Sequence, residues 1–228
     1  MSIKEQFIAN FITKDRWLML VQGLGETFLI TFLAVILGFA IGMLTAVIRS
    51  AHDQTGKLKI PNAIAVIYTT VIRGTPTVVQ LLIIYFVIFG SVNISKTFCA
   101  VLAFGLNSGA YVCEIVRSGI MSVDMGQTEA GRSLGLSYGK TMRYIIFPQA
   151  IKNVLPALGN EFITLFKETS IAGYIGMVDL TRAGDLIRAQ TFSAFMPLIG
   201  VALIYLIFVG IFTKILGIIE RSLRKNER

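Results

Sequence analysis

The sequence predicts an all-α, polytopic membrane protein with about five transmembrane helices. Of its 228 residues, 54% are hydrophobic and only 15% are charged, well below the roughly 25% of charged residues typical of soluble domains. Uncharged runs long enough to cross a hydrocarbon core of about 30 Å recur along the chain. These runs use up most of the length, so we expect one transmembrane domain over 1–228 and no soluble catalytic domain.

The first twenty residues predict a helix that lies in the membrane interface. Ile3, Phe7 and Phe11 share one helical face, and charged side chains occupy the remaining positions. The run 27–48 follows, and it contains no charge. A secretory signal would have a shorter apolar core and a small-residue cleavage site. We therefore expect 27–48 to stay in the membrane as the first span.

A second span is predicted over 59–90, with a kink. The chain is uncharged between Lys59 and Arg73 and again from Gly74 to Gly90, and Arg73-Gly74-Thr75-Pro76 interrupts the two runs with a charge, a flexible residue and a missing backbone donor. The alternative is an interfacial helix over 61–72 followed by a short span, and periodicity does not decide between the two. Residues 97–113 give the third span.

Two further spans are predicted over 155–178, which carries three charged residues, and over 189–213, which carries none. Five spans put the two termini on opposite sides of the membrane. With the amino terminus outside, the inner segments hold about twice as many Lys and Arg residues as the outer ones. We therefore expect an external amino terminus, a cytoplasmic carboxyl terminus and a cytoplasmic segment 118–152.

The charge and cysteine content exclude several other classes. The net charge of +8 fits cytoplasmic loops, because the clustered basic surface that nucleic-acid binding needs is missing. Cys99 and Cys113 would lie about 21 Å apart along one helix, beyond disulfide reach. With one histidine and no Cys/His cluster, we expect neither nucleic-acid binding nor a metal site.

The cytoplasmic segment 118–152 contains a spaced motif. Glu129-Ala130-Gly131 is followed by Gly135 and then by Ile145-Ile146-Phe147-Pro148. This spacing resembles the EAA signature of permease subunits in binding-protein-dependent ABC importers. The third alanine of that signature is Gly131 here, and its leucine is Phe147, while the register is kept.

Further segments are similar to one branch of that family, the polar amino-acid permeases related to histidine, glutamine and arginine uptake systems. The similarity covers nearly the whole chain and is carried by five segments: Arg73-Gly74-Thr75-Pro76, Val79-Gln80, Asn107-Ser108-Gly109-Ala110-Tyr111, Glu114-Ile115-Val116-Arg117 and Phe166-Lys167-Glu168-Thr169-Ser170.

The resemblance implies a type I ABC importer permease in a bacterial inner (plasma) membrane, forming half of a translocation pathway for a polar amino acid. It also implies three kinds of protein partner: two ATP-binding subunits, a second permease chain that is identical or related, and an extracytoplasmic amino-acid-binding protein. A short helix over 127–134 would dock on the ATP-binding subunit. The residues expected to couple the two are Glu129, Ala130, Gly131, Gly135 and Pro148.

We expect no catalytic residue and no cofactor on this chain, with ATP and Mg on the partner subunit. Residues 135–141 look like a phosphate-binding loop, but the glycines are separated by three residues instead of four. No hydrophobic strand precedes them to form the strand–loop–helix cradle. ATP hydrolysis is therefore expected on another chain.

Polar side chains inside two spans are candidates for the substrate path. A buried charge costs at least about 2.5 kcal/mol on insertion scales, so such residues should line an aqueous path or a protein interface. In the fourth span two carboxylates and a hydroxyl share one helical face. A Lys–Glu network or helix pairing is the alternative there, and core packing is the alternative in the third span. The candidates are Asn107, Tyr111, Asn160, Glu161, Thr164, Lys167 and Glu168.

The rival hypothesis is a self-sufficient secondary transporter or channel driven by an ion gradient. Such folds often contain repeated halves or discontinuous helices, but five spans do not divide into two equal repeats. A membrane enzyme is disfavoured, because the polar residues form no nucleophile–base or metal arrangement. The two carboxylates of the fourth span favour a polar neutral or cationic amino acid as substrate.

Overall fold

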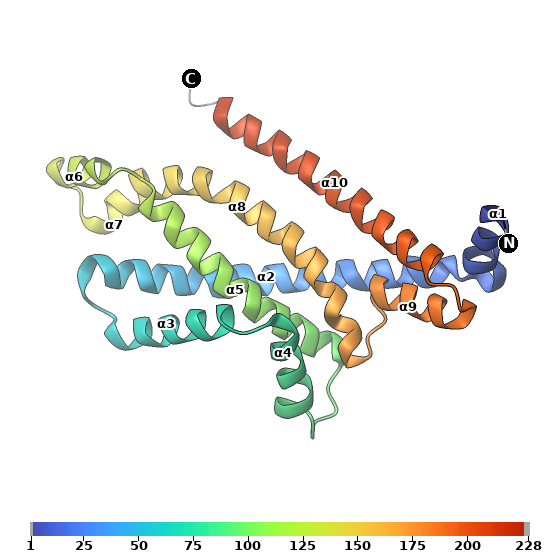
Figure 1. The fold of residues 1–228 in the computed structure, drawn as a ribbon. Helices are drawn as coiled ribbons and strands as arrows, with labels where there is room; N and C mark the ends of the chain where they lie inside the picture. The colour runs from blue at the N-terminus through green and yellow to red at the C-terminus, as the bar shows by residue number, and fades with distance from the viewer. Residues whose placement is uncertain (1, 226–228) are drawn as a thin grey trace.

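The computed structural model describes residues 2–225, and within them all regular structure is helical. Three helices are long and apolar enough to cross a membrane: α2 (Trp17–Thr55), α5 (Lys96–Met121) and α10 (Phe195–Lys225), the last over Phe195–Leu223. These three helices run roughly along the long direction of the molecule (Figure 1). The predicted all-α fold is confirmed.

The predicted kink in the second span is a sharp bend. α3 (Lys59–Arg73) and α4 (Thr77–Leu82), which continues as a π-helical segment to Ile88, meet at 108°. Counted as one broken span, the pair gives a fourth candidate. α8 (Phe147–Glu168) has 22 residues, but its polar side chains keep it below the hydropathy of a clear span. The total of five spans stays a prediction.

The amino-terminal segment differs from the single interfacial helix predicted over 1–20. α1 (Ile3–Phe7) continues as a π-helical turn to Ile12, and a 3₁₀ turn follows at 13–15. Lys14 and Asp15 adopt positive φ, which ends the helix. The Arg16 guanidinium donates to the carbonyl of Ala9 at 2.6 Å and so stabilises this turn. Residues 17–20 already belong to α2.

The core forms where α2 and α5 cross. A Cβ atom placed on Gly42 would lie 2.8 Å from the carbonyl oxygen of Gly109, and one on Gly38 would lie 2.9 Å from the Cβ of Ser108. Only glycine permits this close approach of the two helices. Cys99 is buried on α5 as a free thiol, like the second cysteine of that helix.

The chain after α8 differs from the predicted spans 155–178 and 189–213. α8 ends at Glu168, a 3₁₀ segment occupies Thr169–Ile175, and α9 (Leu180–Thr191) is a separate helix. The Asp179 carboxylate caps α9 by accepting from the N–H groups of Thr181 and Arg182. Phe192 is left-handed, which ends α9 before α10 begins. The predicted boundaries were therefore wrong at both spans.

The segment 118–152 is mostly helical. α5 runs into it as far as Met121, and α6 (Met125–Ser133) follows after a cap in which Asp124 accepts from the N–H of Gly126. α7 (Tyr138–Thr141) then continues through a π-helical segment directly into α8. The short helix predicted over 127–134 is present as α6, at the end of the molecule opposite α1 and α9 (Figure 1).

Candidate functional site

The residues predicted to couple to a partner differ in their exposure. Glu129 and Ala130 are exposed, and so is Pro148 in the first turn of α8, whereas Gly131 is buried. Gly135 has φ +77°, the left-handed conformation that glycine adopts without strain. The exposed pair is therefore available to another protein, and the two glycines shape the helix that presents it.

The presence of glycine at position 131, where the signature has alanine, is explained by the packing of α6 on α7. A Cβ atom at this position would lie 2.6 Å from Cγ2 of Thr141 and 3.0 Å from Cδ1 of Ile145. The alanine of the EAA signature would therefore overlap a buried threonine in this chain. The departure from the signature follows from the packing of α6 against α7.

The two carboxylates of α8 lie half-buried. Ser108 on α5 donates a hydrogen bond of 2.9 Å to Oε1 of Glu161. Glu168, at the other end of the face, interacts with the hydroxyl of Thr77 on α4. Both carboxylates therefore face neighbouring helices of this chain.

The remaining candidates on α8 lie on an adjoining, exposed strip. Asn160, Thr164 and Lys167 are all exposed and follow the spacing i, i+4, i+7. The single polar face predicted for this helix thus has an exposed part and a part held by α4 and α5. A strip of this kind can line a path or meet a second chain.

Asn107 is buried inside the bend between α3 and α4, with only 2% of its surface exposed. It donates to Oε1 of Gln80 at 3.1 Å, and Gln80 Nε2 donates to the carbonyls of Ile72 at 2.7 Å and Thr75 at 3.0 Å. Those carbonyls lie where the helix is broken around Pro76. These contacts support a packing role for Asn107.

Sequence reasoning did not assign a role to Gln80. The signal was present in the Pro76 break, because a broken helix leaves buried carbonyls that need donors. A glutamine four residues after the proline can reach back to them. The partner amide on α5 lies 27 residues further along the chain, which is a tertiary relationship and has no local pattern.

Glu114 on α5 is the centre of a charged network. Its carboxylate pairs with Arg49 of α2, lies 3.8 Å from Arg73 and 3.9 Å from Arg117, and Arg117 in turn bonds Asp53 at 3.0 Å. Three arginines thus face two carboxylates. The network joins α2, α3 and α5, and it was not predicted, because its members come from three separate segments.

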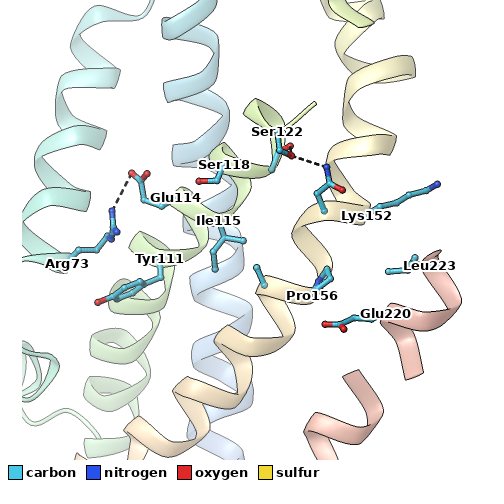
Figure 2. A pocket seen from close by; sticks show the side chains of 13 residues that line it. Arg73, Tyr111, Glu114, Ile115, Ser118, Ser122, Lys152, Pro156, Glu220 and Leu223 are labelled. Carbon is cyan, nitrogen blue, oxygen red and sulfur yellow. Dashed lines mark hydrogen bonds and ion pairs between the residues drawn. The ribbon is translucent and has the colours of Figure 1, made fainter. Parts of the chain in front are cut away.

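Tyr111, the last path candidate, is 38% exposed and lies beneath a guanidinium. The Cζ atom of Arg73 lies 5.5 Å from the centre of its ring, close enough for a cation–π interaction. Both residues line a cavity of about 710 Å³ that also involves α8 and α10 (Figure 2).

A second group of charges lies on α9, at the end of the molecule opposite α6 (Figure 1). The Arg188 guanidinium donates to Asp185 at 2.6 Å, and its hydrogen bond, together with the charge of Arg182, lowers the pKa of Asp185. Lys96, at the start of α5, donates to the carbonyl of Gly176 at 3.1 Å. The start of α5 and the segment before α9 therefore lie on the same side.

Within residues 2–225, no three His, Cys, Asp or Glu side chains come together in a group that could hold a metal ion. The groups described above are instead hydrogen-bonding carboxylates, a basic cluster and a short exposed helix. Such groups can form hydrogen bonds with a polar solute and can contact a partner protein.

Comparison with known proteins gives consistent matches over most of the chain. The family described as binding-protein-dependent transport system inner membrane component matches residues 38–225. The putative glutamine transport system permease protein GlnP of Rickettsia typhi is 39% identical over 92% of this chain and 94% of that protein. The arginine transport system permease protein ArtQ of Bacillus subtilis is 40% identical over 91% and 94%, and GlnP of Escherichia coli is 38% identical over 90% and 93%.

Solved structures agree with these relatives. A chain of an amino acid ABC transporter crystallised with histidines is 44% identical, covers 93% of this chain and 98% of its own length, and superposes with a TM-score of 0.85. The MetNI methionine ABC transporter, in an inward-facing form, is 20% identical over 91% and 97%, with a TM-score of 0.74. At that identity the second match concerns the fold alone.

Proposed function

We propose a function from one premise: the chain belongs to the family of binding-protein-dependent transport system inner membrane components. It is the multi-pass transmembrane permease subunit of an amino-acid ABC importer in the bacterial inner membrane. Its relatives, at 38–40% identity, are named for glutamine and arginine transport. The rival, a self-sufficient carrier, is not favoured by any of them.

The proposal includes three kinds of protein partner. Two separate ATP-binding subunits hydrolyse ATP with Mg, a second permease chain completes the pathway, and an extracytoplasmic binding protein delivers the amino acid. The exposed residues Glu129 and Ala130 on the short helix α6 support docking of an ATP-binding subunit. The large apolar side chains exposed along α2 and α10 support contact with lipid or with the second permease chain.

One structural observation supports a mechanism. α6 packs on α7 at Gly131, and α7 continues through the π-helical segment into α8, which carries Glu161. A movement imposed on α6 by a closing ATP-binding subunit therefore reaches the carboxylates of the path through one continuous helical rod. This link fits alternating access, in which ATP-driven closure reorients the path between the two sides.

The exposed strip and half-buried carboxylates of α8 are the proposed half of the substrate path. Glu161 and Glu168 can offer charge-assisted hydrogen bonds to a cationic or polar side chain. Ser108 holds one oxygen of Glu161 and so fixes the direction of the carboxylate. This arrangement supports transport of a polar neutral or cationic amino acid.

Co-purification tests the partner part of the proposal. The tagged chain is extracted with the ATP-binding subunit expressed from the same genome, and native mass spectrometry measures the composition. We expect a complex containing two permease chains and two ATP-binding subunits. A chain that purifies alone and carries amino acids by itself in liposomes would contradict the proposal and favour the carrier.

A further inference from the structure

The amino-terminal segment folds back over the turn between α9 and α10. We call residues 2–16 the strap; they comprise α1, the π-helical turn and the 3₁₀ turn that precede α2. Asn10, in the π-helical turn, is only 2% exposed. Its Nδ2 atom donates to the hydroxyl of Ser193 at 3.4 Å, and its Oδ1 atom accepts from the hydroxyl of Thr191 at 2.7 Å. These partners lie 183 and 181 residues further along the chain, so the strap makes tertiary contacts.

Arg16 makes a second connection between the strap and α9. Although it is charged, it is only 8% exposed. Its Nε atom donates to Oε1 of Gln190, in the last turn of α9, at 3.1 Å, and Nη1 donates to the carbonyl of Ala9 at 2.6 Å. Arginine is almost never buried in this way unless its donors are used. The strap is therefore held to α9 by specific partners.

Phe11 closes a separate small core at this end of the molecule. A Cβ atom placed on Gly200 of α10 would lie 2.9 Å from Cζ of Phe11, so the ring lies directly against the backbone of α10. The buried side chains around it come from the strap, α2, α9 and α10. They are Phe11, Leu20, Leu180, Ala183, Ile187 and Val201. We call this group the outer core, and the strap completes it.

The other side of the strap is apolar and exposed. Ile3, Phe7 and Ile12 are 77%, 50% and 51% exposed. An apolar side of this kind, with lysines among its neighbours, is typical of a segment that lies in the membrane interface. The strap can therefore contact lipid on one side while it packs on α9 and α10 with the other.

α10 depends on the outer core for its position. Only 11% of the residues in its most apolar stretch are buried, against 67% for α5. In Figure 1 the start of α10 lies beside α1 and α9, and the helix then moves away from α2 toward its carboxyl end. There Glu220 and Leu223 border the cavity of about 710 Å³. The start of α10 is thus enclosed in a core, while its other end has open space beside it.

We propose that the strap stays closed throughout the transport cycle and holds the outer ends of α2, α9 and α10 together as one rigid unit that transport requires. A long helix that is fixed at its outer end can transmit a movement made at its inner end. When the strap is released, α10 loses this fixed end, and ATP hydrolysis continues without efficient uptake. This inference rests on the proposed importer function and adds a structural requirement on the external side.

The test compares released and closed straps in the same protein. The whole complex is reconstituted in liposomes after Cys99 and Cys113 are changed to alanine, and it carries Asn10→Cys and Thr191→Cys, with and without Phe11→Ala. A short bifunctional thiol reagent then links the two new cysteines, and a reductant removes the link. Uptake of labelled L-arginine and L-glutamine and ATPase activity are measured before linking, after linking and after reduction.

We expect opposite responses to Phe11→Ala and to the link. Before linking, the chain with Phe11→Ala should take up several-fold less amino acid per ATP than the chain that keeps Phe11, because it lacks both the hydrogen bonds of Asn10 and the ring over Gly200. Linking should restore most of that uptake, and reduction should remove it again. In the chain that keeps Phe11, linking should leave uptake unchanged, since a strap that never opens is not hindered by a covalent bond.

Two controls separate the strap from general effects. Ile12→Ala replaces Phe11→Ala in a parallel chain, because Ile12 lies in the same turn but is 51% exposed, and its uptake should stay near that of the chain with neither change. Chains with only Asn10→Cys or only Thr191→Cys are treated with the same reagent. They cannot form the link, so the reagent should not restore their uptake.

The outcomes distinguish this inference from the importer function. A parent complex without ATP-driven uptake would overturn the function itself. With a working parent complex, inhibition by the link would show that the strap has to open, and full uptake by the unlinked Phe11→Ala chain would show that the strap is not required. A loss of uptake that the link does not restore would assign Phe11 to local packing. Each of these three results would overturn the proposal for the strap alone.

Discussion

The hydroxyl of Ser108 donates a 2.9 Å hydrogen bond to the carboxylate of Glu161, and so joins α5 to the middle of α8. The bond fixes the direction of this carboxylate. A fixed carboxylate can replace part of the hydration of a cationic solute. Glu161 is therefore the residue of the proposed path whose charge should matter most for substrate choice.

Glu161→Gln should raise the concentration of a cationic amino acid needed for half-maximal uptake more than that of a neutral one. The amide keeps the shape and loses a charge-assisted hydrogen bond, which is roughly twice as strong as a neutral one. Competing uptake of arginine or lysine against glutamine by the assembled complex measures the difference.

Ser108→Ala is the control for that experiment, because it keeps the charge of Glu161 and removes only the donor. It should affect cationic and neutral substrates to a similar extent. Glu168→Gln tests the second carboxylate in the same way. If both Gln variants lose cationic and neutral uptake equally, with the complex still assembled, the carboxylates have a structural role and Lys167 balances their charge.

A second prediction concerns the end of α6. Gly135→Val should uncouple ATP hydrolysis from transport while the chain still inserts, because φ +77° costs a non-glycine residue roughly 1–2 kcal/mol or more. Glu129→Lys should uncouple as well, since it reverses a charge on the exposed face that is proposed to dock. ATPase activity and uptake are measured together on the reconstituted complex.

Gly139→Ala is the matched control for Gly135→Val. A Cβ atom at Gly139 meets open space, as it does at Gly135, but the backbone there is not left-handed. Transport should therefore stay near the level of the unchanged chain. Full ATP-driven uptake by Gly135→Val or by Glu129→Lys would show that α6 does not dock as proposed.

A third prediction concerns the packing between α6 and α7. Gly131→Ala gains about 1 kcal/mol of helix propensity, but its Cβ would lie 2.6 Å from Cγ2 of Thr141, and such overlap typically costs about 1–3 kcal/mol. We expect a lower melting temperature of the purified complex and weaker coupling of ATPase activity to uptake.

Adding Thr141→Ala to Gly131→Ala should restore both properties. The second change removes the methyl group that the new Cβ meets, and the Thr141 hydroxyl is buried without a hydrogen-bond partner among the described residues. Little should be lost with that hydroxyl. A double variant that is no better than Gly131→Ala would mean that another contact sets the requirement for glycine.

The short helix within 118–152 could be predicted from the sequence because its signals are local. The spacing around Glu129, the exposed short helix and the terminating Gly135 are all encoded within a few residues, and the structure has the helix where it was expected. The break at Pro76 was equally local. These features follow from backbone rules, which act over one or two turns.

The contacts that the sequence did not predict join residues that lie far apart in the chain. The Glu114 network joins residues 49, 53, 73 and 117, and Gln80 meets Asn107 across two helices. Periodicity within one segment contains no information about such partners. The boundaries after α8 were wrong because α8 gives way to a 3₁₀ segment after Glu168 inside one apolar run, and because the left-handed Phe192 ends α9 inside the next.

A fourth prediction concerns topology. Cysteines introduced at Asn93 or Ala189 should react with an impermeant thiol reagent added outside, and those at Lys57 or Lys140 should not. All four positions are exposed, so accessibility depends on the side of the membrane. The native Cys99 and Cys113 are first changed to alanine. Labelling of Lys140→Cys from outside would reverse the orientation derived from the positive-inside rule.

The central claim is that this chain imports an amino acid only as part of an ATP-driven complex, and reconstitution tests it most directly. Uptake of labelled arginine and glutamine is measured in liposomes that hold the chain alone, the chain with its ATP-binding subunit, and both together with the binding protein. We predict uptake only with all components and ATP inside. Uptake by the chain alone, driven by an ion gradient and indifferent to ATP, would contradict the account.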